Sequence, residues 1–213
     1  PVNYVRPPGL RPEQLNSANF AANAFQNERS LSLLVEDLGV DTMKGVFKTL
    51  DLDMRFFDSL EMFIHAERIP ELDFDVEDED VSVFIRLGSD FENNFYEYEI
   101  PLTFTDLEVM SGLDVSRPDE LEEYAEEVWR QENYMRFLLK DFITLKKNRN
   151  EQDFPLNQIY EEVVDESQPD RVYRTKGNPN LGLVKAMMVG VVNRDYEKKS
   201  NHRFEVWLNE LRD

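Results

Sequence analysis

Apolar and polar residues alternate with a period of two along much of the chain after residue 29. In the stretch SLEMFIHAE, one face consists of four apolar residues: Leu60, Met62, Ile64 and Ala66. This alternation is typical of a strand with one buried side. The pattern recurs in VSVFIRL (81–87) and in YEYEIPL (96–102), separated by a region that contains Asn93 and Asn94. We therefore predict two paired strands joined by a turn there.

The period changes in the middle of the chain. The stretch LEEYAEEVW (121–129) follows Ser116 and Pro118, which together favour a helix start. Four large apolar residues then recur at helical spacing: Tyr134, Leu138, Phe142 and Leu145. The basic segment KKNR (146–149) follows them, and positive charge is favourable at the C-terminus of a helix. These features predict one or two amphipathic helices within 119–149.

Further strands are predicted towards the C-terminus. Residues 158–164 favour a short strand, and LVKAMMVGVV (183–192) is apolar on both faces apart from Lys185, which predicts a central strand. FEVWLNEL (204–211) favours a last strand. The predicted fold class is mainly β, an antiparallel β-sandwich of the jelly-roll kind with a helical insertion at about 119–149. A transmembrane barrel has the same alternation, but the acidic composition and the helical insertion weigh against it.

We expect two parts in the chain. Residues 1–29 contain Pro7, Pro8 and Pro12 followed by the Asn- and Ala-rich AANAFQN, which predicts an extended arm that packs on another surface. Residues 30–213 form the predicted sandwich domain. Because the chain begins with Pro1 rather than Met, we expect a piece of a longer protein or a processed chain. No apolar run approaches the ~20 residues of a transmembrane helix, so the fragment itself is expected to be water-soluble.

Charge and composition exclude several functions. The chain has 44 acidic and 24 basic residues, a formal net charge of −20, which would repel the phosphate backbone of a nucleic acid. There is no cysteine, which excludes disulfides, thiol nucleophiles and zinc–thiolate sites. A divalent cation or a basic protein surface would instead be attracted.

Candidate metal ligands lie in the acidic run DFDVEDED (73–80). Asp75, Asp78 and Asp80 offer the oxygen ligands that calcium needs, although the run lacks the glycine and the spacing of an EF-hand loop. The alternative is a solvated loop. We identify no catalytic residue, because His65 and His202 are the only histidines and neither an HExxH nor a GxSxG motif is present. His65 is expected on the less buried face of its strand, with a structural role.

Aromatic residues suggest a second type of site. A stacking platform for sugar rings could be formed by Phe84, Phe91, Phe95, Tyr96, Tyr98 and Trp207. Alternation places Tyr96 and Tyr98 on the same face as Ile100 and Leu102, which favours a place in the core instead. A carbohydrate-binding jelly-roll module stabilised by calcium is accordingly the alternative functional hypothesis.

Five long segments carry a more specific resemblance. They are NERSLSLLVEDL (27–38), FKTLDLDMRFFDSLEMFIHAE (47–67), VSVFIRLGSDFENNFYEYEIPL (81–102), KGNPNLGLVKAMMVGVVN (176–193) and FEVWLNELR (204–212). In this order they resemble the soluble region of the SprA/Sov family, giant outer-membrane proteins of gliding motility and of the type IX secretion system. The resemblance covers nearly all of the chain.

The resemblance implies a function without enzymatic activity. The family forms a translocon, a large β-barrel through which folded cargo crosses the outer membrane, with soluble domains inserted between barrel strands. The expected partners are other parts of the same translocon, accessory secretion subunits and secreted cargo. The expected location is the periplasmic or cell-surface side of the outer membrane, as part of a membrane-embedded protein. No cofactor and no catalytic residue are implied.

Overall fold

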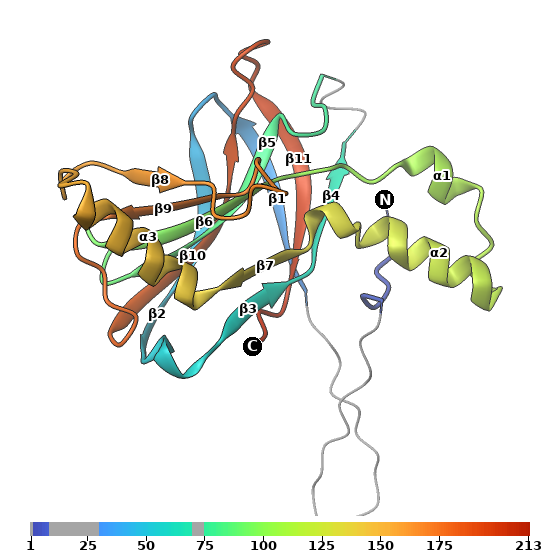
Figure 1. Cartoon of the computed structure of the whole chain (residues 1–213). Helices are drawn as coiled ribbons and strands as arrows, with labels where there is room; N and C mark the ends of the chain where they lie inside the picture. Colours follow the sequence, from blue (N-terminus) through green and yellow to red (C-terminus); the bar gives the residue numbers. More distant parts are fainter. Residues whose placement is uncertain (1, 9–29, 70–74) are drawn as a thin grey trace, which may run out of the picture.

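The structure is a computed structural model that describes residues 2–8, 30–69 and 75–213 (Figure 1). Most of the predicted arm, residues 9–29, therefore lies outside the described residues. The strands are β1 (Ser30–Leu38), β2 (Met43–Leu52), β3 (Ser59–Met62), β4 (Ile64–Arg68), β5 (Val81–Gly88), β6 (Phe95–Pro101), β7 (Met135–Leu138), β8 (Tyr160–Glu162), β9 (Val172–Lys176), β10 (Val184–Asn193) and β11 (His202–Asn209). The helices are η1 (Met54–Phe56), α1 (Leu107–Ser111), α2 (Pro118–Val128), η2 (Gln131–Asn133) and α3 (Leu139–Glu151).

The named strands form three antiparallel sheets, which confirms the predicted mainly β class. The largest has the strand order β2-β10-β5-β6-β9-β8, the second has the order β1-β11-β4, and β3 pairs with β7. As predicted, β10 is a central strand, with β2 on one side and β5 on the other. All three sheets contribute side chains to one apolar core. The six-stranded sheet thus has an inner face, which faces this core, and an outer face.

Alternation decides which residues of β5 and β6 enter the core. The inner face carries Val83, Ile85, Tyr96, Tyr98 and Ile100, all buried. Helix α3 packs against the same face, where Phe142 stacks on Tyr96 with ring centroids 5.0 Å apart. The sequence correctly placed the two tyrosines in the core. Burial of aromatic area of this size is a main source of stability for a sandwich.

The turn between β5 and β6 is organised by Asp90. Its carboxylate accepts hydrogen bonds from the backbone N–H groups of Glu92 at 2.9 Å and Asn94 at 3.1 Å, and from the Asn94 amide at 3.0 Å. Burial alone would raise the pKa of Asp90, but these hydrogen bonds outweigh it and lower the pKa to about 2. The predicted turn therefore carries an ionised carboxylate at its centre.

Two predicted elements differ from the structure. Residues 59–67, expected as one strand, are divided at Phe63 between β3 and β4, which belong to different sheets. The helix expected from Tyr134 begins only at Leu139, because 135–138 form β7 against β3. Met135 and Phe137 are buried on one side of β7, so its local pattern follows the strand period of two.

Helices α1 and α2 project from the side of the sandwich where the described N-terminal segment lies (Figure 1). Helix α2 starts with Pro118 in its first turn, followed by Asp119 and Glu120, which suits the positive end of the helix dipole. The N-terminal segment packs on α2: the backbone N–H of Asn3 donates to the hydroxyl of Tyr124 at 3.0 Å. A second, smaller apolar cluster forms here: it joins side chains of α1, α2 and the N-terminal segment to Trp207 of β11.

Candidate functional site

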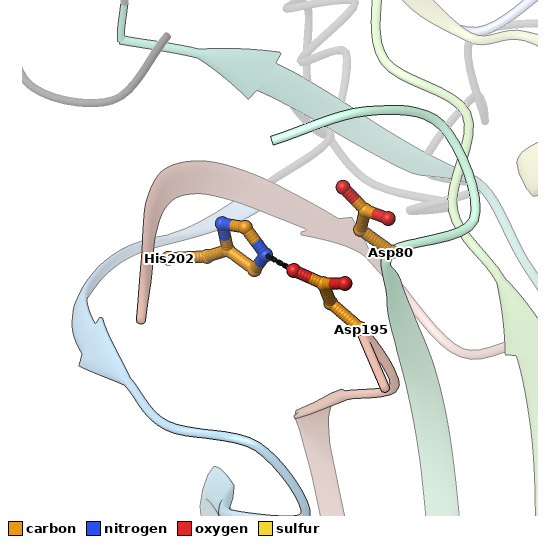
Figure 2. A group of neighbouring side chains, drawn as sticks. All are labelled: Asp80, Asp195 and His202. Carbon is orange, nitrogen blue, oxygen red and sulfur yellow. Dashed lines mark hydrogen bonds and ion pairs between the residues drawn. The ribbon is translucent and has the colours of Figure 1, made fainter. Parts of the chain in front are cut away.

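One cluster of potential metal ligands comprises Asp80, Asp195 and His202, whose ligand atoms lie within 4.8 Å of one another (Figure 2). Asp80 immediately precedes β5, Asp195 follows β10, and His202 begins β11. His202 Nε2 lies 3.1 Å from Asp195 Oδ2, and both side chains are almost completely buried. Burial would raise the pKa of Asp195, but hydrogen bonds from the backbone of Lys198 and Ser200 and from His202 lower it below its usual value.

A positive charge already lies in this cluster. Lys198 Nζ is 2.8 Å from Asp80 Oδ2 and 2.9 Å from Glu77 Oε2, and it also donates to the backbone carbonyl of Asp75 at 2.8 Å. The hydrogen bonds that Lys198 donates to Asp80 and to Glu77, in that order of size, raise the pKa of Lys198 well above its usual range. The cluster therefore ties the β10–β11 connection to the acidic run by an ion pair.

The three predicted metal ligands take different places. Asp80 is in the cluster, Asp75 contributes its carbonyl to Lys198, and Asp78 accepts hydrogen bonds from Arg68 at 2.9 Å and from the backbone of Phe104 at 2.8 Å. Calcium prefers six to eight oxygen ligands, whereas this cluster offers two carboxylates, an imidazole nitrogen and an ammonium group. Metal binding by these residues stays a prediction. Asp195, His202 and Lys198 were missed as a group because they meet the acidic run only in the fold.

The aromatic residues named for a sugar platform are buried, with one exception. Phe84, Phe95, Tyr96, Tyr98 and Trp207 are each at most 9 % exposed. Phe91 is half-buried, and its ring contacts Phe47 at a centroid distance of 5.7 Å. Burial of these five residues argues against the stacking platform, and for Tyr96 and Tyr98 it confirms the place in the core that their alternation favoured.

His65 is also more buried than its strand face suggested. It is 0 % exposed, and its ring lies 4.3 Å from Trp207 and 6.3 Å from Trp129. Its Nδ1 lies 3.0 Å from the hydroxyl of Thr105, and its Nε2 lies 3.6 Å from Glu67 Oε2. A threonine hydroxyl, a histidine and a carboxylate in this order resemble a catalytic nucleophile, its general base and the group that orients the base. All three are buried, and His65 Nδ1 also lies 2.9 Å from the carbonyl oxygen of Val128, so the arrangement joins β4 to the end of α2.

An ion-pair ladder covers the outer face of the six-stranded sheet. We use this term for the side chains of Arg86, Glu97, Glu99, Arg174 and Arg194. Arg86 pairs with Glu97 at 2.6 Å, Arg174 with Glu97 at 3.2 Å, and Arg194 with Glu99 at 2.7 Å. Arg174 also pairs with Glu99. The glutamates are at most 4 % exposed, so the long arginine side chains enclose them.

The ladder also contacts aromatic residues on the same outer face. The guanidinium of Arg86 lies 4.0 Å from the ring centre of Phe95 and 5.6 Å from that of Phe84. Burial would raise the pKa of Glu99, but Arg194 and Arg174 outweigh it and lower the pKa. A groove of about 790 Å³ lies over the ladder. Because the charged groups of the ladder are paired with one another, they are not available to bind a ligand in this groove.

A second groove, of about 700 Å³, lies beside α2. Its aromatic residues are Phe63, Trp129 and Tyr134. Acidic residues also line it: Glu123, Glu126, Glu127 and Glu132. Pro8, Val109, Arg130 and Gln131 complete the lining. We call this the insertion groove. An aromatic surface with acidic residues around it is suited to binding a ligand.

Strand β2 is the other accessible feature. It is an edge strand that pairs with β10 alone among the described strands, and all of residues 44–49 are exposed. Phe47 is 66 % exposed and Val46 is 39 % exposed. An open edge with exposed apolar side chains is the kind of surface to which another chain adds a strand.

Comparisons with known proteins agree with the sequence resemblance. None of the described helices is long and apolar enough to cross a membrane. No curated protein matches the chain. The SprA_N family model, described as motility related/secretion protein, matches residues 1–213, which is the whole of the sequence. The chain therefore belongs to the SprA_N family of motility-related and secretion proteins.

Proposed function

We propose that this chain is a structural and interaction domain, without enzymatic activity, of a large outer-membrane translocon of type IX secretion and gliding motility. Membership of a motility-related and secretion family is the observation that carries the proposal. Partners would be other parts of the translocon, accessory secretion subunits and secreted cargo. The domain would lie on the periplasmic or cell-surface side of the outer membrane and would need no cofactor.

The distribution of polar groups supports an interaction role. The buried ionisable residues are joined to partners that hold elements together: His202 to Asp195, Glu99 to two arginines, and His65 to the insertion. The accessible features are an open sheet edge at β2 and the insertion groove. Exposed edges and apolar grooves are surfaces through which proteins assemble.

In-cell cross-linking tests this function. A photo-reactive amino acid replaces Phe47 on β2 in the full-length protein, expressed in its own cells at the native level. Because Phe47 is 66 % exposed on an open edge, we expect ultraviolet-dependent cross-links to another part of the translocon, a secretion subunit or a cargo protein. The control position is Glu166, an exposed loop residue.

Two results would contradict the proposal. One is a normal rate of secretion and gliding in cells that express the protein with residues 30–213 deleted, provided that this deletion variant is present in the outer membrane at the native level. The other is turnover of a substrate by the purified chain that a single substitution removes without unfolding it. We propose no second function, because the aromatic residues on which sugar binding depended are largely buried.

A further inference from the structure

The insertion groove combines an aromatic surface with carboxylates that lack a partner among the described residues. Glu127 and Glu132 both pair with Arg130, at 2.6 Å and 3.6 Å. Glu123 and Glu126 are exposed and form no ion pair or side-chain hydrogen bond with any residue that the structure describes. The groove thus has an excess of negative charge next to aromatic rings.

The aromatic rings are held in place by contacts with one another and with residues outside the groove. Phe63 lies between Tyr134, at a centroid distance of 4.9 Å, and Trp129, at 6.5 Å. The indole N–H of Trp129 donates to the carbonyl of Val5 at 2.8 Å, and the hydroxyl of Tyr134 donates to Glu61. The rings therefore need little reorganisation to receive a ligand, which lowers the entropic cost of binding.

The chemistry of the groove selects its occupant. Aromatic faces attract Lys and Arg by cation–π interaction, and unpaired carboxylates attract the same groups by charge. Val109, which is 46 % exposed at the groove, offers apolar contact as well. The volume of about 700 Å³ is within the range of pockets that enclose a short peptide or a drug-sized molecule.

We propose that the insertion groove binds a short segment of a partner protein in which Lys or Arg stands next to an aromatic or aliphatic residue. The basic group would lie by Glu123 and Glu126, and the apolar side chain would lie on Phe63 and Val109, which are half-buried and exposed, whereas Trp129 is buried behind them. This inference rests on the proposed function, since it assigns a partner chemistry to an interaction domain. It differs from edge pairing at β2, which needs no basic residue in the partner.

Peptide binding to the 213-residue chain tests the proposal. The probe is the fluorescein-labelled peptide amide Lys-Phe-Arg-Leu-Lys, measured by fluorescence anisotropy at low ionic strength. A first matched peptide replaces its basic residues by norleucine, and a second replaces Phe and Leu by Ser. We expect the probe peptide to bind at least about tenfold more tightly than either matched peptide, because charge and apolar contact should each contribute about 1.4 kcal/mol or more, which corresponds to tenfold.

The protein variants separate this groove from the overall negative charge. Glu123→Gln with Glu126→Gln should weaken binding by about five- to tenfold, at roughly 0.5 to 0.7 kcal/mol per exposed carboxylate. The control, Glu122→Gln with Glu166→Gln, changes the net charge equally at two exposed residues outside the groove lining and should leave affinity within about twofold. In nuclear magnetic resonance spectra, the peptide should shift the indole N–H signal of Trp129 and leave that of Trp207 nearly unchanged.

Each other outcome overturns the proposal. Equal weakening in the two double variants would mean that only net charge matters, and an unshifted Trp129 signal would place the peptide elsewhere. Self-association of the chain that Glu123→Gln with Glu126→Gln abolishes would identify a second copy as the occupant. If the peptide does not bind while Phe47 still cross-links to a secretion partner in cells, the groove inference fails and the proposed function stands.

Discussion

The ion-pair ladder and the insertion groove both contain glutamates, but those of the ladder are buried and paired and two of those at the groove are exposed. In the ladder, Glu97 and Glu99 are enclosed by three arginines and are nearly inaccessible to water. At the groove, Glu123 and Glu126 are exposed and have no cationic partner among the described residues. Removal of a buried, paired carboxylate leaves its cationic partners uncompensated, whereas an exposed carboxylate without a described partner is available to another molecule. The comparison predicts opposite effects of substitution in the two regions.

The largest effect should follow from breaking the ladder. Glu99→Ala leaves Arg174 and Arg194 partly buried without one of their partners, so the free energy of unfolding should fall by about 3 kcal/mol. Chemical denaturation of the 213-residue chain measures it. Glu161→Ala is the control, since Glu161 pairs with Arg174 but its side chain is 61 % exposed. That change should cost less than about 1 kcal/mol, and equal costs for the two would refute the distinction between buried and exposed pairs.

A somewhat smaller effect is expected where the turn between β5 and β6 meets β9. Gly177 has φ +70°, and a Cβ there would lie 1.9 Å from the carbonyl oxygen of Asn93. Gly177→Ala should therefore lower the free energy of unfolding by about 2 kcal/mol through backbone strain and displacement of the turn. Gly112→Ala is the matched control, because Gly112 has φ −85° and the nearest atom to its Cβ is at 3.5 Å. Thermal unfolding should show little change for that variant.

The ladder should also make the free energy of unfolding depend on pH. Its arginines lower the pKa of Glu99 in the folded state below the value of about 4.3 expected in the unfolded chain. The unfolded state therefore binds the proton first, and the stabilisation is complete above about pH 4.3 and is lost as pH falls through the lower folded pKa. Wild type and Glu99→Gln should differ more in free energy of unfolding at about pH 7 than at about pH 3. A difference that does not change with pH would contradict this linkage.

The smallest effect on stability is expected at the groove. Glu123→Gln with Glu126→Gln should change the free energy of unfolding by less than about 0.5 kcal/mol, because both residues are exposed and without a described partner. Denaturation under the conditions of the peptide assay measures it. A loss of more than about 1 kcal/mol would show that these carboxylates have a structural role, and the contrast with the ladder would disappear.

The sequence predicted those elements whose pattern is local. Strands β5 and β6 alternate strictly between core and outer face, and β10 is apolar on both faces, so their positions followed from periodicity. Strand β7 was predicted as helix because Tyr134, Leu138 and Phe142 are spaced by four residues, and its pairing with β3 outweighed that pattern. Pairing between distant segments overrides local preference in this way.

The candidate sites were harder to predict because they form through long-range contacts. The ion pair between Lys198 and Asp80 joins residues 118 positions apart. His65 is buried by Trp129 and Trp207, which come from a helix end and from another strand, and its own strand pattern contains no sign of them. The insertion groove likewise needs Phe63 and the helices α1, α2 and η2 to be in position. Only the acidity of α2 was visible in the sequence, without the aromatic surface that makes it specific.

The most direct test of the groove uses the full-length protein in its own cells, with a photo-reactive amino acid in place of Val109. We expect a cross-link to another polypeptide at a site next to Lys or Arg and an aromatic or aliphatic residue. We also expect a several-fold lower yield when Glu123→Gln and Glu126→Gln are introduced. A cross-link only within the same chain, or a yield that these substitutions leave unchanged, would contradict binding of a basic partner segment in the groove.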